Sequence, residues 1–216
     1  MSKKYEIFLF DLDGTITDSA LGITNSVMYA LKKFGIEETD RTKLYKFIGP
    51  PLTESFEKFY GFTKEQSLDG VKYYREYYHD KGIYENRVYD GLEEVLKKIN
   101  EAGKQAIVAT SKPEEYAKII IDHFHLTKYF ACVAGMEMDG GRGTKAQVIT
   151  YALEKNDITD KSKVLMIGDR EHDVIGAHEN GLDCLGILYG FGSRKEFEEA
   201  GADYIRENVE DILQFV

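Results

Sequence analysis

The chain has 216 residues, of which 43% are hydrophobic and 31% are charged, and its formal net charge at pH 7 is −10. This composition is ordinary for a soluble globular protein, and the length allows one sizeable domain or a core with a small insert. The negative charge repels nucleic acid and anionic membranes at long range, so we expect neither a nucleic acid polymer nor a membrane as a partner. An anionic substrate would be repelled too, unless the site carries its own cation.

The N-terminal segment and the cysteines indicate a cytoplasmic protein. Residues 1–6 run directly into the first expected strand, so we expect no signal peptide, and no apolar stretch is long enough to cross a bilayer. Cys132 and Cys184 lie far apart in the chain, in apolar surroundings and without ligand-type residues near either one. We predict two reduced and buried thiols.

The first expected strand leads into a pair of acids. Residues 7–10 form an unbroken apolar run, typical of a strand that is buried on both faces of a parallel sheet. Asp11 and Asp13 follow it, one residue apart, and then Gly14. Because open α/β sheets bind ligands beyond the carboxyl ends of their strands, we expect these acids on a loop at a reacting centre. Each carboxylate raises the cost of ionising the other, and a bound cation or a divided acid and base role would remove that conflict.

The next segment is helical throughout. From residue 17 to residue 84 the apolar residues follow a helical period, and we find no strand candidate. The three expected helices are marked by Ile23, Val27, Leu31 and Phe34, by Phe56, Phe59 and Tyr60, and by Tyr73, Tyr74, Tyr77 and Tyr78. We interpret residues 17–84 as a cap domain that could exclude water and contact a substrate. Residues 1–16 and 85–216 would then form the core domain.

The rest of the chain alternates between strand-like and helical patterns. The apolar runs span 105–110, 130–134, 164–167, 184–188 and, more weakly, 202–205. Helices are expected over 92–99, over 145–153, over 173–180 and after Pro113, where Tyr116, Ile119, Ile120 and Phe124 would form the buried stripe. This alternation predicts an α/β fold with a doubly wound parallel sheet.

Three of the expected strands end in polar groups. The first ends at Asp11, the second at Thr110-Ser111-Lys112, and the third at a stretch that contains Asp169 and Asp173. If these strands are parallel neighbours, their ends meet at one edge of the sheet. A glycine-rich stretch over 140–145 also places Lys145 near a helix start. The same stretch contains an arginine, Arg142, which could reach a substrate phosphate or could simply be exposed to solvent.

Taken in chain order, these residues resemble the four motifs of the haloacid dehalogenase-like hydrolases. The motifs are Asp11-x-Asp13-Gly14-Thr15, then Thr110, then Lys145, and then Gly168-Asp169-x-x-x-Asp173. The resemblance covers essentially the whole chain and includes the helical insert, which stands where this family has its smaller type of cap. Lys145 departs from the pattern of many relatives, since it is followed by Ala146 and not by proline.

The resemblance implies a role for each motif residue. Asp11 is the implied nucleophile, which forms an aspartyl-phosphate, and Asp13 the implied acid and base. Mg²⁺ is the implied cofactor, held by the Asp11 carboxylate, the Asp13 backbone carbonyl and Asp169. Asp173 would orient Lys145 or a metal-bound water. The phosphoryl group would be bound by Lys145, by the Thr110 hydroxyl and by the loop amides after Asp11 and Thr110. Ser111 and Arg142 are further phosphate-binding candidates that the motifs themselves do not imply.

The second acid narrows the implied reaction. Dehalogenases and phosphonatases of this family lack an acid at the position of Asp13, and transport ATPases carry threonine there. The resemblance therefore implies a phosphoric monoester hydrolase, a Mg²⁺-dependent phosphatase that acts on a small phosphorylated metabolite. We expect a monomer or a weak homodimer.

The substrate prediction depends on two further stretches. Residues 48–56, with Gly49-Pro50-Pro51-Leu52, resemble the 5′-nucleotidase-like group, and residues 169–173 resemble the branch that also contains phosphoglycolate phosphatases. A 5′-nucleotidase-like substrate is slightly favoured, and phosphoglycolate is the alternative. A β-phosphoglucomutase-like mutase, a non-enzymatic phosphoacceptor and a degenerate binding protein stay open. Asp13 and the cap argue against the phosphoacceptor, and the complete motif set argues against the degenerate protein.

Overall fold

The structure, a computed structural model, describes residues 4–138 and 141–216. These residues form two compact units, one made of 4–17 and 88–216 and the other of 18–87. The first unit is an α/β unit and the second is helical. None of the described helices is long and apolar enough to cross a membrane.

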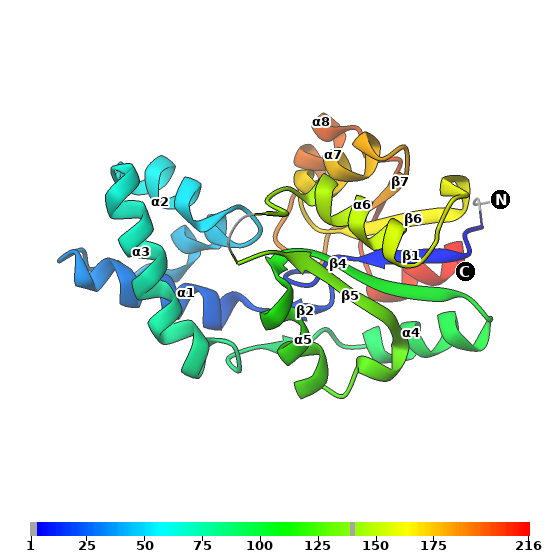
Figure 1. The fold of residues 1–216 in the computed structure, drawn as a ribbon, viewed down its shortest axis with the longest axis horizontal. Helices are drawn as coiled ribbons and strands as arrows, with labels where there is room; N and C mark the ends of the chain where they lie inside the picture. The colour runs from blue at the N-terminus through cyan, green and yellow to red at the C-terminus, as the bar shows by residue number, and fades with distance from the viewer. Residues whose placement is uncertain (1–3, 139–140) are drawn as a thin grey trace. The chain divides into compact units, whose positions relative to one another are not determined.

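The α/β unit is built on one six-stranded sheet, in the order β5-β4-β1-β6-β7-β8. Every pair of neighbouring strands is parallel, which confirms the predicted α/β fold with a doubly wound parallel sheet (Figure 1). The strands are β1 (Ile7–Phe10), β4 (Gln105–Pro113), β5 (Phe130–Met136), β6 (Val164–Gly168), β7 (Asp183–Ile187) and β8 (Tyr204–Arg206).

Helices cover both faces of this sheet. They are α4 (Leu92–Glu101), α5 (Glu114–His123), α6 (Lys145–Lys155), α7 (Glu171–Glu179) and α8 (Arg194–Ala200), with short helices at Thr127–Tyr129, Lys161–Lys163 and Val209–Phe215. Figure 1 shows α6, α7 and α8 on one side of the sheet and α4 and α5 on the other. Because both faces are covered, the central strands β1 and β6 are apolar without alternation, and Phe8, Leu9 and Phe10 are completely buried.

The register of the sheet brings the strand ends together. Phe10 lies opposite Val108 of β4 and Ile167 of β6, so the next residues of these three strands emerge at the same edge. The Asp11 backbone N–H still donates to the Ile167 carbonyl, at 2.9 Å, which fixes the start of the loop. The convergence expected from the sequence thus follows from the pairing of β1 with β4 and β6.

Two details of the α/β unit differ from expectation. β4 continues past Thr110 to Pro113, and its pairing with β5 shifts register between these two residues, as in a β-bulge. On α5 the expected stripe is wrong at one position, because Ile119 is 38% exposed. Ala117 and Ile121 are the buried neighbours of Tyr116 and Ile120 instead.

The helical unit has an aromatic interior. Its elements are α1 (Ala20–Lys33), a short helix at Arg41–Phe47, α2 (Leu52–Tyr60), α3 (Lys64–Tyr77) and a π-helical turn at Tyr78–Gly82. Phe62 stacks on Phe56 with ring centroids 5.5 Å apart and lies 4.6 Å from Phe34. Two strands of two residues each, β2 (Thr17–Asp18) and β3 (Arg87–Val88), pair with each other. β2 corrects the expectation that residues 17–84 contain no strand, since two residues are too few to show a period.

Candidate active site

A buried lysine connects two of the strand-end acids. The Lys145 ammonium donates to Oδ1 of Asp11, at 2.7 Å, and lies 2.7 Å from Oδ1 of Asp173. It also donates to the Ala109 carbonyl, at 3.1 Å. Burial alone would lower the pKa of Lys145, but the charges of Asp11 and Asp173 outweigh that effect and raise it. Lys145 is therefore a permanent positive charge beside Asp11.

The start of α6 places this lysine. Thr144 caps the helix, since its hydroxyl accepts from the Gln147 backbone N–H while the Gln147 side chain accepts from the Thr144 N–H. Gly176 on α7 gives the lysine its room, because a Cβ there would lie 2.7 Å from Lys145 Cγ. The glycine-rich stretch before the helix is described from Gly141 onward, and Gly140 lies outside the described residues.

Three acids lie close enough to share a cation. Asp11, Asp169 and Asp173 each offer a carboxylate oxygen, and these oxygens all lie within 4.8 Å of one another. Burial raises the pKa of Asp169 well above its usual range, and the charges of Asp173 and Asp11 raise it further. Burial also raises the pKa of Asp173, to about 6, although the Lys145 ammonium opposes that rise. A cation at this place would remove the conflict between the carboxylates.

The chemistry of these donors fits a hard divalent cation. Oδ1 of Asp169 is buried and has no hydrogen-bond partner among the described residues, although Oδ2 accepts from the Phe191 backbone N–H at 2.8 Å. In the described part of the chain, the buried charged side chains are four acids and two lysines, with a formal charge of −2: Asp11, Asp13, Asp169, Asp173, Lys112 and Lys145. Mg²⁺ prefers oxygen ligands of this kind and would balance that charge.

Three glycines form a tight cradle around Asp169. Gly14 has φ +87°, and a Cβ there would lie 2.1 Å from Oδ2 of Asp169. A Cβ on Gly190 would lie 2.4 Å from both the Asp169 Cβ and the Gly14 carbonyl, and one on Gly192 would lie 1.9 Å from the Asp169 carbonyl. The Tyr189 hydroxyl ties the same loop to the Thr15 carbonyl, at 3.0 Å. No pattern in the sequence singles out this loop, which begins just after β7.

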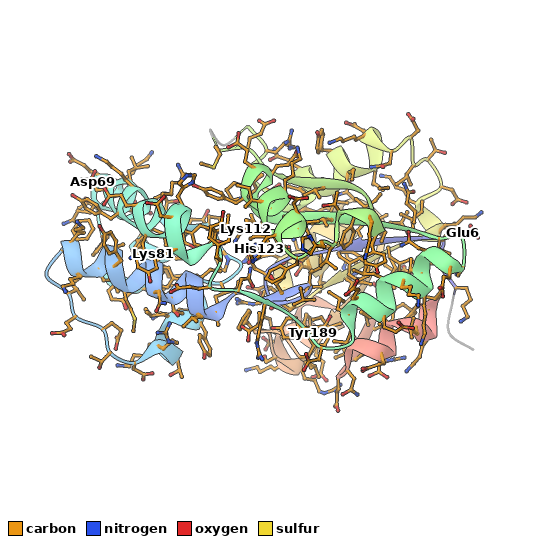
Figure 2. The ribbon with its side chains drawn as sticks, turned by 90° about the horizontal axis from the view of Figure 1, so that it is seen from below. Glu6, Asp69, Lys81, Lys112, His123 and Tyr189 are labelled. Atoms are coloured by element: carbon orange, nitrogen blue, oxygen red, sulfur yellow. The ribbon has the colours of Figure 1, made fainter. Side chains whose placement is uncertain are left out.

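Asp13 has a lysine partner that the sequence analysis did not assign. The Lys112 ammonium donates to Oδ2 of Asp13, at 2.8 Å, and both residues are 8% exposed. Lys112 lies near the end of β4 and is labelled, like Tyr189, in Figure 2. The signal in the sequence was a lysine two residues after Thr110, at the end of an apolar run.

The remaining expected phosphate-binding residues fall into two groups. Thr110 is buried at the same strand end, and its hydroxyl accepts from the Lys112 backbone N–H at 3.2 Å, with Ser111 half-buried between them. Arg142 is not brought into the acidic cluster. Its guanidinium donates to the Gly135 carbonyl and to Glu137 and Glu114, and lies 3.9 Å from the centre of the Tyr151 ring.

The contacts of Arg142 differ from both expectations for this residue, a substrate phosphate and solvent. The contacts to Gly135 and Glu114 fasten the loop before α6 to β5 and to the start of α5. A guanidinium held by two carboxylates is already paired, which leaves it poorly suited to bind a phosphate. In this structure Arg142 supports the loop that leads to Lys145.

Comparisons with known proteins agree with this geometry. Residues 8–187 match a family described as haloacid dehalogenase-like hydrolase. A 5′-nucleotidase of Pseudomonas aeruginosa is 45% identical over 193 residues, which cover 89% of this chain and 87% of that protein. The crystal structure of a predicted phosphatase from Clostridium acetobutylicum is 47% identical, with a TM-score of 0.94 and 98% of each chain covered.

A third similar protein is named as a kinase and not as a phosphatase. The tyrosine-protein kinase PtkA of Mycobacterium tuberculosis is 35% identical over 187 residues, which cover 87% of this chain. This chain spans 63% of the length of that protein.

Proposed function

Because the chain belongs to the haloacid dehalogenase-like hydrolase family, we propose that it is a Mg²⁺-dependent phosphatase of small phosphomonoesters, with 5′-nucleotides as its preferred substrates. One observation carries the proposal: the buried Asp11, paired with Lys145 at 2.7 Å, lies in a cluster of acids that suits a divalent cation. The nucleotide preference is supported by the similarity to the 5′-nucleotidase of Pseudomonas aeruginosa. In such a site the positive charges of Lys145 and of the cation would attract a phosphate, although the chain as a whole carries a net negative charge.

The reaction would proceed in two steps through an aspartyl-phosphate. In the first, an Asp11 carboxylate oxygen bonds to phosphorus while the bond from phosphorus to the leaving oxygen breaks, and Asp13 gives that oxygen a proton. In the second, Asp13 takes a proton from a water whose oxygen bonds to phosphorus while the bond to Asp11 breaks. Inorganic phosphate leaves, and Asp11 and Asp13 return to their starting states.

The other residues would bind and orient the phosphoryl group. Asp11, Asp169 and the Asp13 backbone carbonyl would hold Mg²⁺, which supplies positive charge to the phosphoryl oxygens when bound. Lys145 adds a second positive charge, and Thr110 donates a hydrogen bond from its hydroxyl. Asp173 holds Lys145 in place through the 2.7 Å ion pair. We assign the helical unit the role of a cap that excludes water during the reaction.

Phosphate release from a panel of substrates tests the proposal. The panel contains p-nitrophenyl phosphate, nucleoside 5′-monophosphates, phosphoglycolate, pyrophosphate and sugar phosphates, each with Mg²⁺ and with EDTA. We expect Mg²⁺-dependent release, with the highest kcat/KM for a nucleoside 5′-monophosphate. The highest value for phosphoglycolate would instead support the alternative substrate. The absence of release from every compound would contradict the proposed function.

Two further measurements on the same panel distinguish a phosphatase from a phosphoacceptor and from a mutase. A stable aspartyl-phosphate without release of phosphate would indicate a phosphoacceptor. Interconversion of sugar phosphates without release of phosphate would indicate a mutase. With Mg²⁺-ATP and a tyrosine peptide we expect no phosphotyrosine, because Asp13 beside the aspartyl-phosphate would activate a water for its hydrolysis.

A further inference from the structure

Lys112 is a buried lysine that the proposed mechanism leaves without a role. Its ammonium lies 2.8 Å from Oδ2 of Asp13, and the two side chains are 5% and 11% exposed. Burying two opposite charges removes both from water, and their attraction only partly offsets that cost, so such a pair contributes little to stability compared with apolar residues of the same volume. The position of the pair at the strand ends suggests a role in the site.

The end of β4 is shaped to hold this lysine. The register shift against β5 lies between Thr110 and Pro113, and bulges of this kind often redirect a side chain next to an active site. The backbone N–H of Lys112 donates to the Thr110 hydroxyl, at 3.2 Å. Gly135 on β5 permits the close approach, because a Cβ there would lie 2.6 Å from the Lys112 carbonyl. The backbone around Lys112 is thus fixed from both sides.

The two oxygens of Asp13 have different surroundings. Oδ2 accepts the hydrogen bond from Lys112, whereas Oδ1 is buried and has no hydrogen-bond partner within the described parts of the chain. A carboxyl group with one oxygen held and the other unpaired has a defined orientation. The unpaired oxygen is the one that is left available for a further hydrogen bond.

We propose that Lys112 is a positioning residue, which holds Oδ2 of Asp13 so that Oδ1 exchanges the proton with the reacting oxygens. This inference depends on the proposed phosphatase function. In the first step the proton leaves Oδ1 for the leaving oxygen, as that oxygen separates from phosphorus. In the second, Oδ1 receives a proton from the attacking water. Lys112 takes no part in the proton transfer itself.

The nature of the leaving group makes the proposal testable. The alkoxide released from a nucleoside 5′-monophosphate is a strong base and needs a proton as it leaves. p-Nitrophenolate is a weak base and leaves without one. If Lys112 acts by placing Oδ1, its loss must lower the rate for the nucleotide far more than the rate for p-nitrophenyl phosphate.

The experiment compares Lys112→Met with Lys104→Met. Lys104 is a matched control, because it precedes β4 at the opposite end of the strand and donates to the Tyr5 carbonyl. We expect Lys112→Met to lower kcat/KM about 100-fold for a nucleoside 5′-monophosphate and less than about 10-fold for p-nitrophenyl phosphate. Lys104→Met should leave both values within about twofold. Equal losses for the two substrates in Lys112→Met would overturn the proposal.

Two further variants distinguish the loss of this hydrogen bond from a general loss of folding. Lys112→Gln retains a donor for Oδ2, so we expect it to recover most of the rate for the nucleotide. In the Asp13→Asn background, Lys112→Met should cause no further loss, because a residue that acts through Asp13 has no target there. A further loss of about 10-fold or more would overturn the proposal.

Two controls separate this inference from the proposed function. Calorimetric titration of Lys112→Met with Mg²⁺ should give the wild-type affinity, and a loss of affinity would show a merely structural role. A wild-type chain that hydrolyses no phosphomonoester would overturn the proposed function itself. An active wild type together with an unchanged Lys112→Met would overturn only the role of Lys112.

Discussion

The two units of the molecule bury different kinds of polar group. Within the described residues, every buried charged side chain belongs to the α/β unit, at the carboxyl ends of its strands or at the helix starts that follow them. The buried polar side chains of the helical unit are small hydroxyls, such as Thr24, Ser26 and Ser67. The contacts of charged side chains in the helical unit are partly buried, as between Arg41 and Asn25 at 2.8 Å, or exposed, as between Tyr29 and Glu76 at 3.2 Å.

This difference indicates which unit carries the functional site. Burying a charge costs free energy, so a cluster of buried charges indicates a site at which a bound ligand offsets that cost. The helical unit needs no such compensation, because its interior consists mainly of aromatic rings. We therefore expect substitutions of the buried charged residues in the α/β unit to affect the reaction, and substitutions in the interior of the helical unit to affect the stability of that unit.

The largest expected effect is that of Asp11→Asn. The amide cannot attack phosphorus, so we expect kcat for p-nitrophenyl phosphate to fall at least about 10⁴-fold. The variant should keep its fold, which circular dichroism and a thermal melt would check. Wild-type turnover in a folded Asp11→Asn protein would remove the chemistry from this cluster.

Lys145→Met is expected to have the next largest effect. It removes a charge from the phosphoryl group and leaves Asp11 and Asp173 beside each other without their common partner. The loss of one such electrostatic contact costs about 10²–10³ in kcat. Steady-state kinetics on the same substrate measures it. An effect on KM alone would show that Lys145 binds substrate without assisting the reaction.

The two central strands could be predicted from the sequence, because β1 and β6 are apolar at every position. Asp11, Asp169 and Asp173, which follow these strands, lie close together in the structure. Lys112 was not foreseen, because its place depends on a register shift between two strands that pair only in the folded sheet. The role of Arg142 stayed open between a substrate phosphate and solvent, because its partner Glu114 is 28 residues away in the chain and a sequence pattern does not reveal such a pairing.

Close packing was the other feature that the sequence could not reveal. In the sequence, Gly190 and Gly192 look like the glycines of an ordinary turn. In the structure they are needed because the loop approaches Asp169 so closely that a Cβ at either position would clash with it. A pattern of hydrophobic residues predicts which face of an element is buried, but it carries no information on which atoms of two distant segments touch.

Metal and pH should change the stability of the α/β unit together. Without metal, the pKa values of Asp169 and Asp173 are raised in the folded state above those of the unfolded chain. Between about pH 4 and the raised pKa values, the folded state binds more protons than the unfolded one, so the free energy of unfolding decreases as the pH rises. The contribution of these acids is therefore complete below about pH 4 and is lost as the pH rises through about 6 and beyond. In EDTA, the part of the stability that comes from these acids should therefore decrease from pH 5 to pH 8.

Mg²⁺ should reverse that loss at pH 8. At a free concentration 100 times its Kd, a ligand of the folded state alone adds about 2.7 kcal/mol to the free energy of unfolding. Thermal melts at the two pH values, with EDTA and with Mg²⁺, give both effects. Asp169→Asn is the control, and it should flatten the pH dependence and abolish the response to Mg²⁺.

The smallest expected effect lies in the helical unit. A Cβ on Gly22 would lie 1.9 Å from the Gly82 carbonyl, where α1 meets the π-helical turn. Gly22→Ala should therefore destabilise this unit by about 1–3 kcal/mol. Hydrogen exchange would localise the change to residues 18–87, while the affinity for Mg²⁺ stays unchanged. The neighbouring Leu21→Ala is the control, since that side chain is 50% exposed.

The spacing of the two buried ion pairs along the chain has a consequence for synthesis. Lys112 follows Asp13 by 99 residues, and Lys145 follows Asp11 by 134. A ribosome thus releases both N-terminal acids long before either lysine exists, and contacts of such large sequence separation form late and slowly. The acids stay in water until their counter-charges arrive. A chain that stops before α6 lacks Lys145 and therefore cannot form its ion pair with Asp11.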